Sequence, residues 1–194
     1  MPNAEAKRRI RAELKAELAR LDHEDTVAWS AAIRDRIAAS QPFRAARVIL
    51  AFVPTPEEPD LNALLDLARA QGKRLTLPRI DWSLRTMAAA EAPANRQELT
   101  AGRHGILEPT PAAPTVPLPD LDLILIPGLA FDEQGYRLGR GAGFYDRFLA
   151  QPALTAARIA PAFEVQLRPT LPRDAWDLPL HAIATERRWI EFER

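Results

Sequence analysis

Apolar residues in the first forty positions recur at the spacing of an amphipathic helix. Ile10, Leu14 and Leu18 lie four residues apart, which places them on one helical face. A second and less regular apolar set follows an acidic stretch at residues 22–25, and acidic residues are typical of a helix start. The pattern therefore predicts a pair of helices over residues 1–40.

After residue 40 the apolar pattern changes to short runs separated by polar segments. Val48–Val53 is a short apolar run, and Leu61–Ala70 has the periodicity of an amphipathic helix that ends at Gly72. Arg74–Leu77 reads as a second strand, which we expect to end at Pro78. A strand, a helix and a strand in succession favour parallel pairing through a right-handed crossover.

The second half of the chain contains further predicted strands and one long irregular segment. Residues 92–119 are rich in proline and lack periodicity, so we expect a surface excursion that covers a ligand. Leu121–Ile126 is almost entirely apolar, as in a strand buried on both faces. We predict a single α/β domain over residues 1–194, with three layers, a mostly parallel sheet and the helical pair of residues 1–40 packed on the core. The other predicted elements are strands at Leu84–Ala90, Arg158–Phe163, His181–Thr185 and Arg188–Phe192, a turn at Glu133–Gly135 and a helix at about Phe144–Ala150.

Composition narrows the classes of function. The 26 basic residues equal the 26 acidic ones, which argues against a dedicated nucleic-acid or membrane-surface binder. The chain has no cysteine, so disulfides, thiolate nucleophiles and cysteine-based zinc sites are excluded. No apolar run approaches membrane-spanning length, and the N-terminal segment lacks the apolar centre of a signal peptide. We expect a cytoplasmic monomer without nucleic-acid or membrane partners.

The most informative segment is RLGRGAGFYD, from Arg137 to Asp146. Its three alternating glycines can take backbone conformations that expose successive N–H groups to an anion. The predicted helix begins directly after them, and Arg137 and Arg140 add positive charge. Asp146 could meet phosphates only through a cation, for which Mg²⁺ is the usual choice. The segment matches neither the Walker A pattern nor the dinucleotide fingerprint, and it could also be a plain strand-to-helix turn.

This segment closely resembles the signature of the 5-formyltetrahydrofolate cyclo-ligases, or methenyltetrahydrofolate synthetases, Arg-Leu-Gly-x-Gly-x-Gly-Tyr-Tyr-Asp. The preceding PGLAFD resembles the family's lead-in, and Phe144 departs from the pattern because tyrosine is common there. The resemblance implies a fold like that of sugar-phosphate isomerases and CoA transferases. It also implies a ligase of one-carbon metabolism that binds ATP and 5-formyltetrahydrofolate and uses Mg²⁺. The ATP contacts implied in this segment are Arg137, Leu138, Gly139, Arg140, Gly141, Ala142, Gly143, Phe144 and Tyr145.

Segments elsewhere also resemble the family. KRRIR at the N-terminus resembles its Lys-x-x-x-Arg, which implies that Lys7, Arg8 and Arg11 contact ATP and that Arg11 also reaches the substrate. The alternative is a solvated helix face. FVPTPEEPD resembles the pterin-binding region, which implies that Val53 lines the pocket and Glu58 binds the pterin. The alternative there is a charged loop that caps a helix.

Two further positions complete the site that the resemblance implies. His104, just before GILEP, aligns with an aromatic folate-contact position, although an exposed loop histidine is an equal alternative. Asp177, in WDLPLHAIATE, becomes a second magnesium ligand beside Asp146, whereas a cap or turn is the alternative. The predicted substrate contacts are Arg11, Val53, Glu58, His104 and Tyr145.

The implied reaction is cyclisation of 5-formyltetrahydrofolate to 5,10-methenyltetrahydrofolate with ATP, through a phosphorylated formyl group (an iminium phosphate). Phosphoryl transfer requires in-line positioning and neutralisation of charge and no protein nucleophile. We assign the catalytic roles to Arg140 and Lys7. Two alternatives remain open at this point, an enzyme like the sugar-phosphate isomerases and CoA transferases, and a nucleotide-binding module without catalysis.

Overall fold

A seven-stranded sheet forms the centre of the protein, in a computed structural model that describes residues 2–174 and 176–193. The strand order is β12-β11-β9-β6-β1-β2-β3, and the five strands from β11 to β2 run parallel. The edge strands β12 and β3 are antiparallel to their neighbours, so the prediction of a mostly parallel sheet is confirmed. The strands are β1 (Val48–Leu50), β2 (Arg74–Asp81), β3 (Thr86–Glu91), β6 (Leu123–Leu125), β9 (Ala157–Pro161), β11 (Ala182–Ala184) and β12 (Trp189–Glu191).

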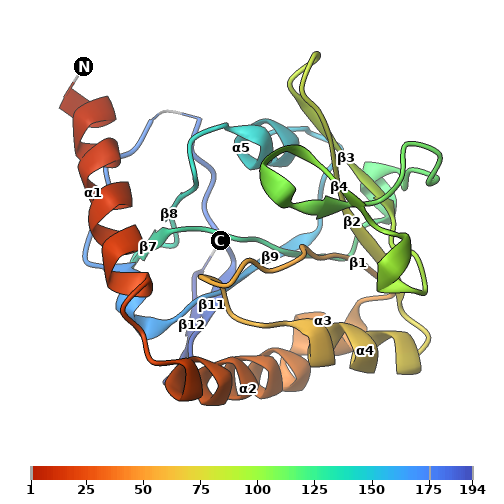
Figure 1. The fold of residues 1–194 in the computed structure, drawn as a ribbon, viewed down its shortest axis with the longest axis horizontal. Coiled ribbons are helices and arrows are strands. Elements are labelled where there is room, and N and C mark those ends of the chain that lie inside the picture. Colours follow the sequence, from red (N-terminus) through yellow and green to blue (C-terminus); the bar gives the residue numbers. More distant parts are fainter. Residues whose placement is uncertain (1, 175, 194) are drawn as a thin grey trace.

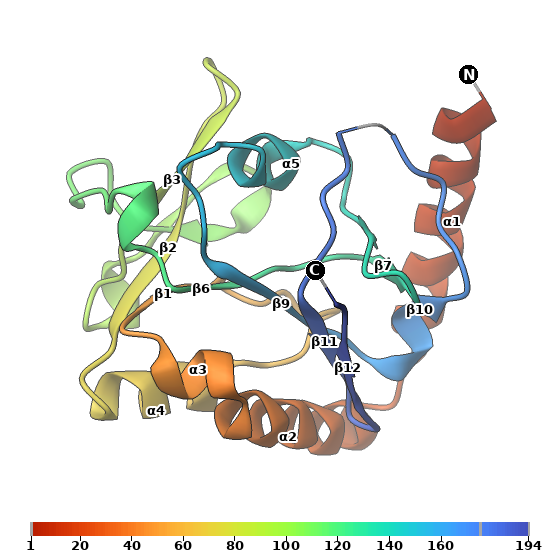
Figure 2. The same cartoon turned by 180° about the vertical axis from the view of Figure 1, so that it is seen from behind.

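Helices cover both faces of this sheet. Helices α2, α3 and α4 lie along one face and α5 lies over the other, which confirms the three predicted layers (Figures 1 and 2). Asp22 caps α2, because its carboxylate accepts the backbone N–H groups of Glu24 and Asp25. The helices are α1 (Pro2–Leu18), α2 (His23–Ala39), α3 (Gln41–Ala45), α4 (Asn62–Ala70) and α5 (Phe144–Leu149).

Strand β2 extends beyond the predicted end. Pro78 lies inside β2, opposite Ala89 of β3, so the prediction that Pro78 ends the strand is wrong. The reason lies in the neighbouring strand, because β1 pairs with β2 only as far as Thr76. Beyond that residue β2 has a strand on one side only, where a missing N–H is tolerated.

Helix α1 stands at one end of the sheet, beside a small second sheet (Figures 1 and 2). Leu14 is fully buried there with Ala130, Leu138 and Leu171, and Ile10 packs against the same cluster. This packing carries the N-terminal half of α1 to the glycine-rich segment. The second sheet, which the sequence did not predict, consists of β7 (Ala130–Asp132), β8 (Arg137–Leu138) and β10 (Leu167–Arg168).

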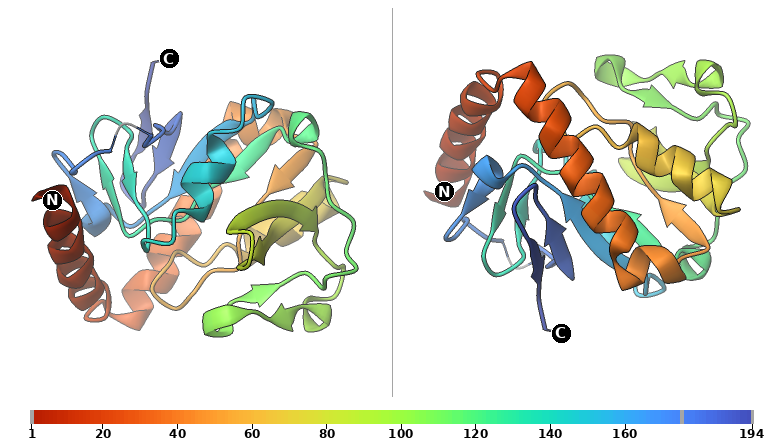
Figure 3. Two further views of the ribbon diagram at one scale, coloured as in Figure 1. Left: turned by 90° about the horizontal axis from the view of Figure 1, so that it is seen from above. Right: turned by 90° about the horizontal axis from the view of Figure 1, so that it is seen from below.

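The proline-rich excursion at residues 92–119 folds over the β2–β3 side of the molecule (Figure 3). Arg79 anchors it by donating hydrogen bonds to the backbone oxygens of Pro111 and Ala113. The excursion contains a two-stranded hairpin of β4 (Thr100–Ala101) and β5 (Leu107–Glu108). The structure also contains four short 3-10 helices. Three begin within the excursion, η1 (Arg96–Glu98), η2 (Arg103–Gly105) and η3 (Leu118–Asp120), and η4 (Glu164–Gln166) lies between β9 and β10.

Candidate active site

A pocket of about 450 Å³ opens at the carboxyl ends of β1 and β6. Phe52 and Val53, which follow β1, and Pro127 and Gly128, which follow β6, line it. The chain leaves β1 toward β2 and leaves β6 toward β9, in opposite directions along the sheet. Ligands of open α/β sheets bind at such a switch point, because the diverging connections leave a crevice there.

The glycine-rich loop forms one wall of this pocket. Gly141 has φ +109° and Gly143 has φ +70°, conformations that side chains other than glycine rarely adopt. None of the backbone N–H groups from Gly139 to Gly143 donates a hydrogen bond to an acceptor in the described part of the chain. Five successive unpaired amides beside a pocket provide the donors that an anion requires.

Cationic side chains surround the same loop. Arg11 donates from Nε to the backbone oxygen of Gly139 at 2.9 Å, and its guanidinium lies next to Gly141. Arg137 is buried and donates to Asp146 Oδ1 at 2.7 Å. Together with the unpaired amides, these groups give the loop a positive character that suits phosphate oxygens.

Lys7 is held by two carboxylates from the C-terminal part of the chain. Its Nζ lies 2.7 Å from Asp174 Oδ2 and 2.9 Å from Asp177 Oδ2. Burial alone would lower the pKa of Lys7, but the hydrogen bonds to Asp174 and Asp177 outweigh burial and the pKa is raised. The hydrogen bond from Lys7 lowers the pKa of Asp174. Lys7 and Asp174 are therefore both charged at neutral pH.

Glu58 lies on the opposite side of the pocket, with its side chain only 9% exposed. Its Oε2 accepts the backbone N–H of Thr55 at 2.9 Å. Arg140 reaches across from the glycine loop, with Nη2 at 3.0 Å from Thr55 Oγ1 and 3.4 Å from Glu58 Oε1. Arg140 therefore ties the two halves of the pocket together, a contact that the sequence did not reveal.

Tyr145 combines a partly exposed ring with a buried hydroxyl group. The hydroxyl has no hydrogen-bond partner among the residues that the structure describes. Burial raises the pKa of Tyr145, with Arg137 opposing the shift and Glu58 adding to it. The group therefore stays protonated at neutral pH and is a hydrogen-bond donor without an acceptor beside the pocket.

An edge-to-face aromatic pair lines the pocket where α5 begins. Trp82, from the β2–β3 hairpin, packs edge-on against Phe144 with ring centroids 4.8 Å apart. Arg103 lies over the Trp82 ring at 4.6 Å, and Arg147 lies over Phe144 at 5.2 Å. Phe144 thus supplies a ring face to a cation and an edge contact, for which it needs no hydroxyl.

Two carboxylates of the pocket suit a magnesium ion. Asp146 uses Oδ1 for Arg137 and Asp177 uses Oδ2 for Lys7, so Asp146 Oδ2 and Asp177 Oδ1 accept no hydrogen bond from the described residues. Within residues 2–174 and 176–193, no three His, Cys, Asp or Glu side chains gather into a metal-binding group. Mg²⁺ is usually held by one or two carboxylates together with substrate phosphates and water, so this donor set fits it.

The comparisons with known proteins agree with one another. The model of the 5-formyltetrahydrofolate cyclo-ligase family matches residues 3–186. The chain belongs to this family. The 5-formyltetrahydrofolate cyclo-ligase of Mycolicibacterium smegmatis is 37% identical over 147 residues, which are 74% of this chain and 76% of the relative. That of Mus musculus is 28% identical over 190 residues, 93% of this chain and 94% of the relative.

A solved structure shows the same fold. The NMR structure of the Aquifex aeolicus 5,10-methenyltetrahydrofolate synthetase superposes with a TM-score of 0.83 at 29% identity. The match covers 97% of this chain and 93% of that one. The family resemblance drawn from RLGRGAGFYD is therefore confirmed, and it extends over nearly the whole chain.

Most of the site residues expected for a cyclo-ligase come together in the one pocket. Arg8 is exposed and does not line it, and the side chain of His104 lies outside the described part of the structure. Sequence reasoning missed Trp82 and Asp174, because only the fold brings their loops to the glycine segment. The expected residues that line the pocket are Lys7, Arg11, Val53, Glu58, Arg137, Leu138, Gly139, Arg140, Gly141, Ala142, Gly143, Phe144, Tyr145, Asp146 and Asp177.

No helix within the described residues is long and apolar enough to cross a membrane.

Proposed function

We propose that this chain catalyses the ATP-dependent cyclisation of 5-formyltetrahydrofolate to 5,10-methenyltetrahydrofolate, with release of ADP and phosphate. The observation that carries the proposal is the row of unpaired amides from Gly139 to Gly143 beside the pocket. Family membership supplies the reaction class, since the relatives are 5-formyltetrahydrofolate cyclo-ligases. Membership of this family favours a cyclo-ligase over the two alternatives, which are an enzyme like the isomerases and CoA transferases and a binding module without catalysis.

The phosphates of ATP bind to the glycine loop in this proposal. The amides of Gly139, Gly141 and Gly143 donate to phosphate oxygens, while Arg11 and Lys7 neutralise charge. Asp146 and Asp177 hold Mg²⁺, which supplies charge neutralisation between the phosphates when it is bound. Fixed donors of this kind stabilise a transferring phosphoryl group, because they need no reorganisation during the reaction.

The pterin ring binds on the opposite side, at Glu58 and Tyr145. A carboxylate accepts hydrogen bonds from the amino and ring N–H groups of a pterin, and Glu58 is nearly buried in this pocket. The unpartnered Tyr145 hydroxyl donates to a polar atom of the substrate. Arg140 contacts both Thr55 and Glu58, so it holds the phosphate loop at a fixed place relative to the pterin.

The order of bond changes follows from the chemistry of the formyl group. Its oxygen would leave very slowly as hydroxide, so it first takes the γ-phosphoryl group of ATP and ADP departs. N10 of the folate then attacks the same carbon, the carbon–oxygen bond breaks, and phosphate leaves together with the proton from N10. The protein contributes position and charge to these steps, because no covalent bond to a side chain is required.

We also propose that the enzyme acts as a cytoplasmic monomer without nucleic-acid or membrane partners. Balanced charge, with 26 basic and 26 acidic residues, supports the lack of a polyanionic partner. Light scattering during size exclusion tests the monomer, and a dimer mass would contradict it.

The test of the reaction is to mix the protein with Mg·ATP and 5-formyltetrahydrofolate and to follow the methenyl chromophore. We expect product to appear only with ATP, in equal amount to released phosphate. Binding of ATP without phosphate release would indicate a binding module, and turnover of a sugar phosphate without ATP would indicate an isomerase. Either result would refute the proposal.

A further inference from the structure

The hairpin formed by β2 and β3 stands beside the glycine loop. The two strands pair over six pairs of residues, and β3 packs beside α5. The turn of the hairpin spans residues 82–85. Asp81 orders this turn, because its carboxylate accepts the backbone N–H groups of Ser83 and Leu84. The tip of the hairpin therefore has a defined shape where it meets the loop.

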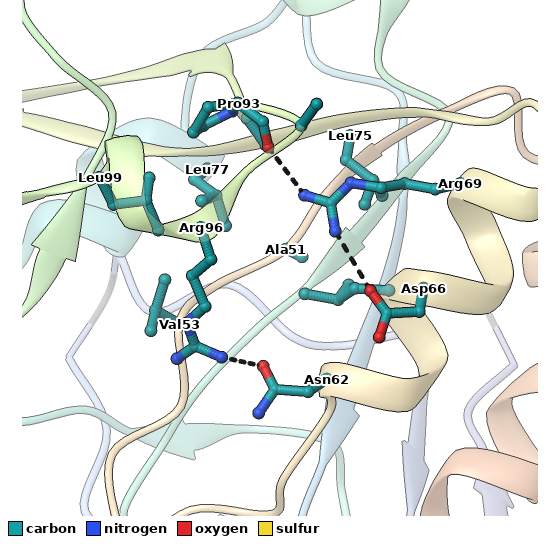
Figure 4. Close-up of a pocket in the computed structure, with 13 residues that line it drawn as sticks. Ala51, Val53, Asn62, Asp66, Arg69, Leu75, Leu77, Pro93, Arg96 and Leu99 are labelled. Atoms are coloured by element: carbon teal, nitrogen blue, oxygen red, sulfur yellow. Dashed lines mark hydrogen bonds and ion pairs between the residues drawn. The ribbon is translucent and has the colours of Figure 1, made fainter.

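The base of the hairpin is held on the face of β2 that lies opposite the active site. Figure 4 shows a second pocket of about 250 Å³ there, between α4, β2 and the chain that follows β3. Arg69 of α4 donates to the backbone oxygen of Pro93 at 3.1 Å. Arg96 donates in the other direction, to the side-chain oxygen of Asn62 at the start of α4. These bonds tie the chain after β3 to α4 and so anchor the hairpin.

Arg147 joins the tip of this hairpin to the glycine loop. Its Nε donates to the backbone oxygen of Arg85 at 2.9 Å, and its Nη2 donates to the backbone oxygen of Ala142 at 3.0 Å. The guanidinium also lies over the ring of Phe144, 5.2 Å from the ring centroid. Arg147 is exposed and does not line the active-site pocket, so it contacts the outer side of the loop. Any effect on a bound phosphate therefore passes through the loop or through the charge of the guanidinium.

The bond to Ala142 fixes the direction of a backbone amide. In a trans peptide the C=O of one residue and the N–H of the next point in opposite directions, and the described part of the chain has no cis peptide. Arg147 holds the Ala142 oxygen on the outer side of the loop. The N–H of Gly143 therefore points to the inner side, where the pocket lies.

We propose that Arg147 is a positioning residue of the phosphate site, which holds the Gly143 amide in the direction that a phosphate oxygen of ATP requires. This inference rests on the proposed function, since it takes ATP as the ligand of the loop. A donor that is already oriented needs no reorganisation when charge develops on the transferring phosphoryl group. The planar guanidinium holds its donors at a fixed spacing, so one side chain sets the loop relative to the anchored hairpin.

The first test measures steady-state kinetics with Mg·ATP and 5-formyltetrahydrofolate. We expect Arg147→Gln to lower kcat/KM for ATP about tenfold, less than full misplacement of the loop would cost, with KM for the folate unchanged. Arg147→Lys keeps the charge but lacks the planar fork, so it should show most of the same loss. Arg9→Gln is the control for loss of a positive charge. Arg9 is exposed, pairs with Glu13 and does not line the pocket, so all constants should stay at wild type.

The second test follows the backbone ¹⁵N–¹H resonances of the loop while Mg·ATP is added without folate. In the wild type the amides of Gly143 and Arg140 should both shift. In Arg147→Gln the shift of the Gly143 amide at saturating Mg·ATP should be smaller. The Arg140 amide should still respond as in the wild type, because Arg11 holds the adjoining oxygen of Gly139. A general loss of stability would not separate the two amides in this way.

Three results would overturn the role of Arg147 while leaving the cyclisation intact. They are an unchanged kcat/KM for ATP in Arg147→Gln, full activity of Arg147→Lys, which would mean that charge alone matters, and a Gly143 amide that responds to Mg·ATP as in the wild type. A wild type that forms no methenyl product would instead refute the proposed function. The amide shifts would then still decide whether Arg147 orients the loop toward ATP.

Discussion

Substitution of Gly143 by alanine tests whether the shape of the glycine loop matters for ATP. Gly143 has φ +70°, and a methyl group there would lie 2.8 Å from Arg147 Nη1. The left-handed conformation costs a residue with a Cβ about 1–2 kcal/mol. For a chain of this length, that cost corresponds to a fall in Tm of about 2–8 °C.

Gly72 provides a matched control. It has φ +74°, and an added methyl group would meet no atom within 4 Å. Gly72→Ala should therefore lower Tm by a similar amount, since the backbone strain is the same. Gly72 lies at the end of α4, and it does not line the active-site pocket.

The two variants should differ in catalysis. In Gly143→Ala the loop relieves its strain by rotating the amides, and Arg147 must leave its place beside the backbone oxygen of Ala142. Misplacement of a phosphate-binding group by about 1 Å can cost on the order of a hundredfold in rate. We expect kcat/KM for ATP to fall about 10- to 100-fold in Gly143→Ala and to stay unchanged in Gly72→Ala. Equal ATP turnover by both variants at saturating folate would refute the reasoning.

Three further predictions concern charged groups. Asp146→Asn removes a proposed Mg²⁺ ligand and the counterion of buried Arg137, so ATP-dependent phosphate release should fall at least ~100-fold. Near wild-type phosphate release at limiting Mg²⁺ would contradict this role. Asp132→Asn should lower the free energy of unfolding by about 2–4 kcal/mol in urea titrations. The reason is that the fully buried carboxylate accepts three backbone N–H groups and pairs with Arg173. An unchanged urea midpoint would contradict this cost. The pKa of Asp174 is lowered in the folded state, so its contribution to the free energy of unfolding is present near neutral pH and is lost as the pH falls below about 4. The difference in stability between the wild type and Asp174→Asn should therefore shrink from pH 7 to pH 3. A constant difference would exclude this linkage.

Local sequence patterns predicted those parts of the protein that depend on near neighbours. The nearly continuous apolar run of Leu121–Ile126 corresponds to β6, which is buried on both faces, and the helical period of Leu61–Ala70 corresponds to α4, which is buried on one face. Asp22 was likewise found as part of a helix start. The short strands β7, β8 and β10 escaped prediction, since segments of two or three residues carry no readable period.

The contacts across the site could not be predicted, because they join loops far apart in the chain. Lys7 meets Asp174 through the packing of α1 against the second sheet, and no local pattern encodes that meeting. Arg140 was expected to face phosphate, yet its guanidinium contacts Thr55 and Glu58. Pro78 was misjudged for a similar reason, since the end of β1 decides whether β2 tolerates it.

The most direct test of the central claim is to follow the backbone amide resonances of the glycine loop by ¹⁵N–¹H NMR while Mg·ATP is added. The account predicts large shifts and slower hydrogen exchange for the amides from Gly139 to Gly143, with Gly72 unchanged. Unshifted loop amides in a sample that still releases phosphate from ATP would contradict it.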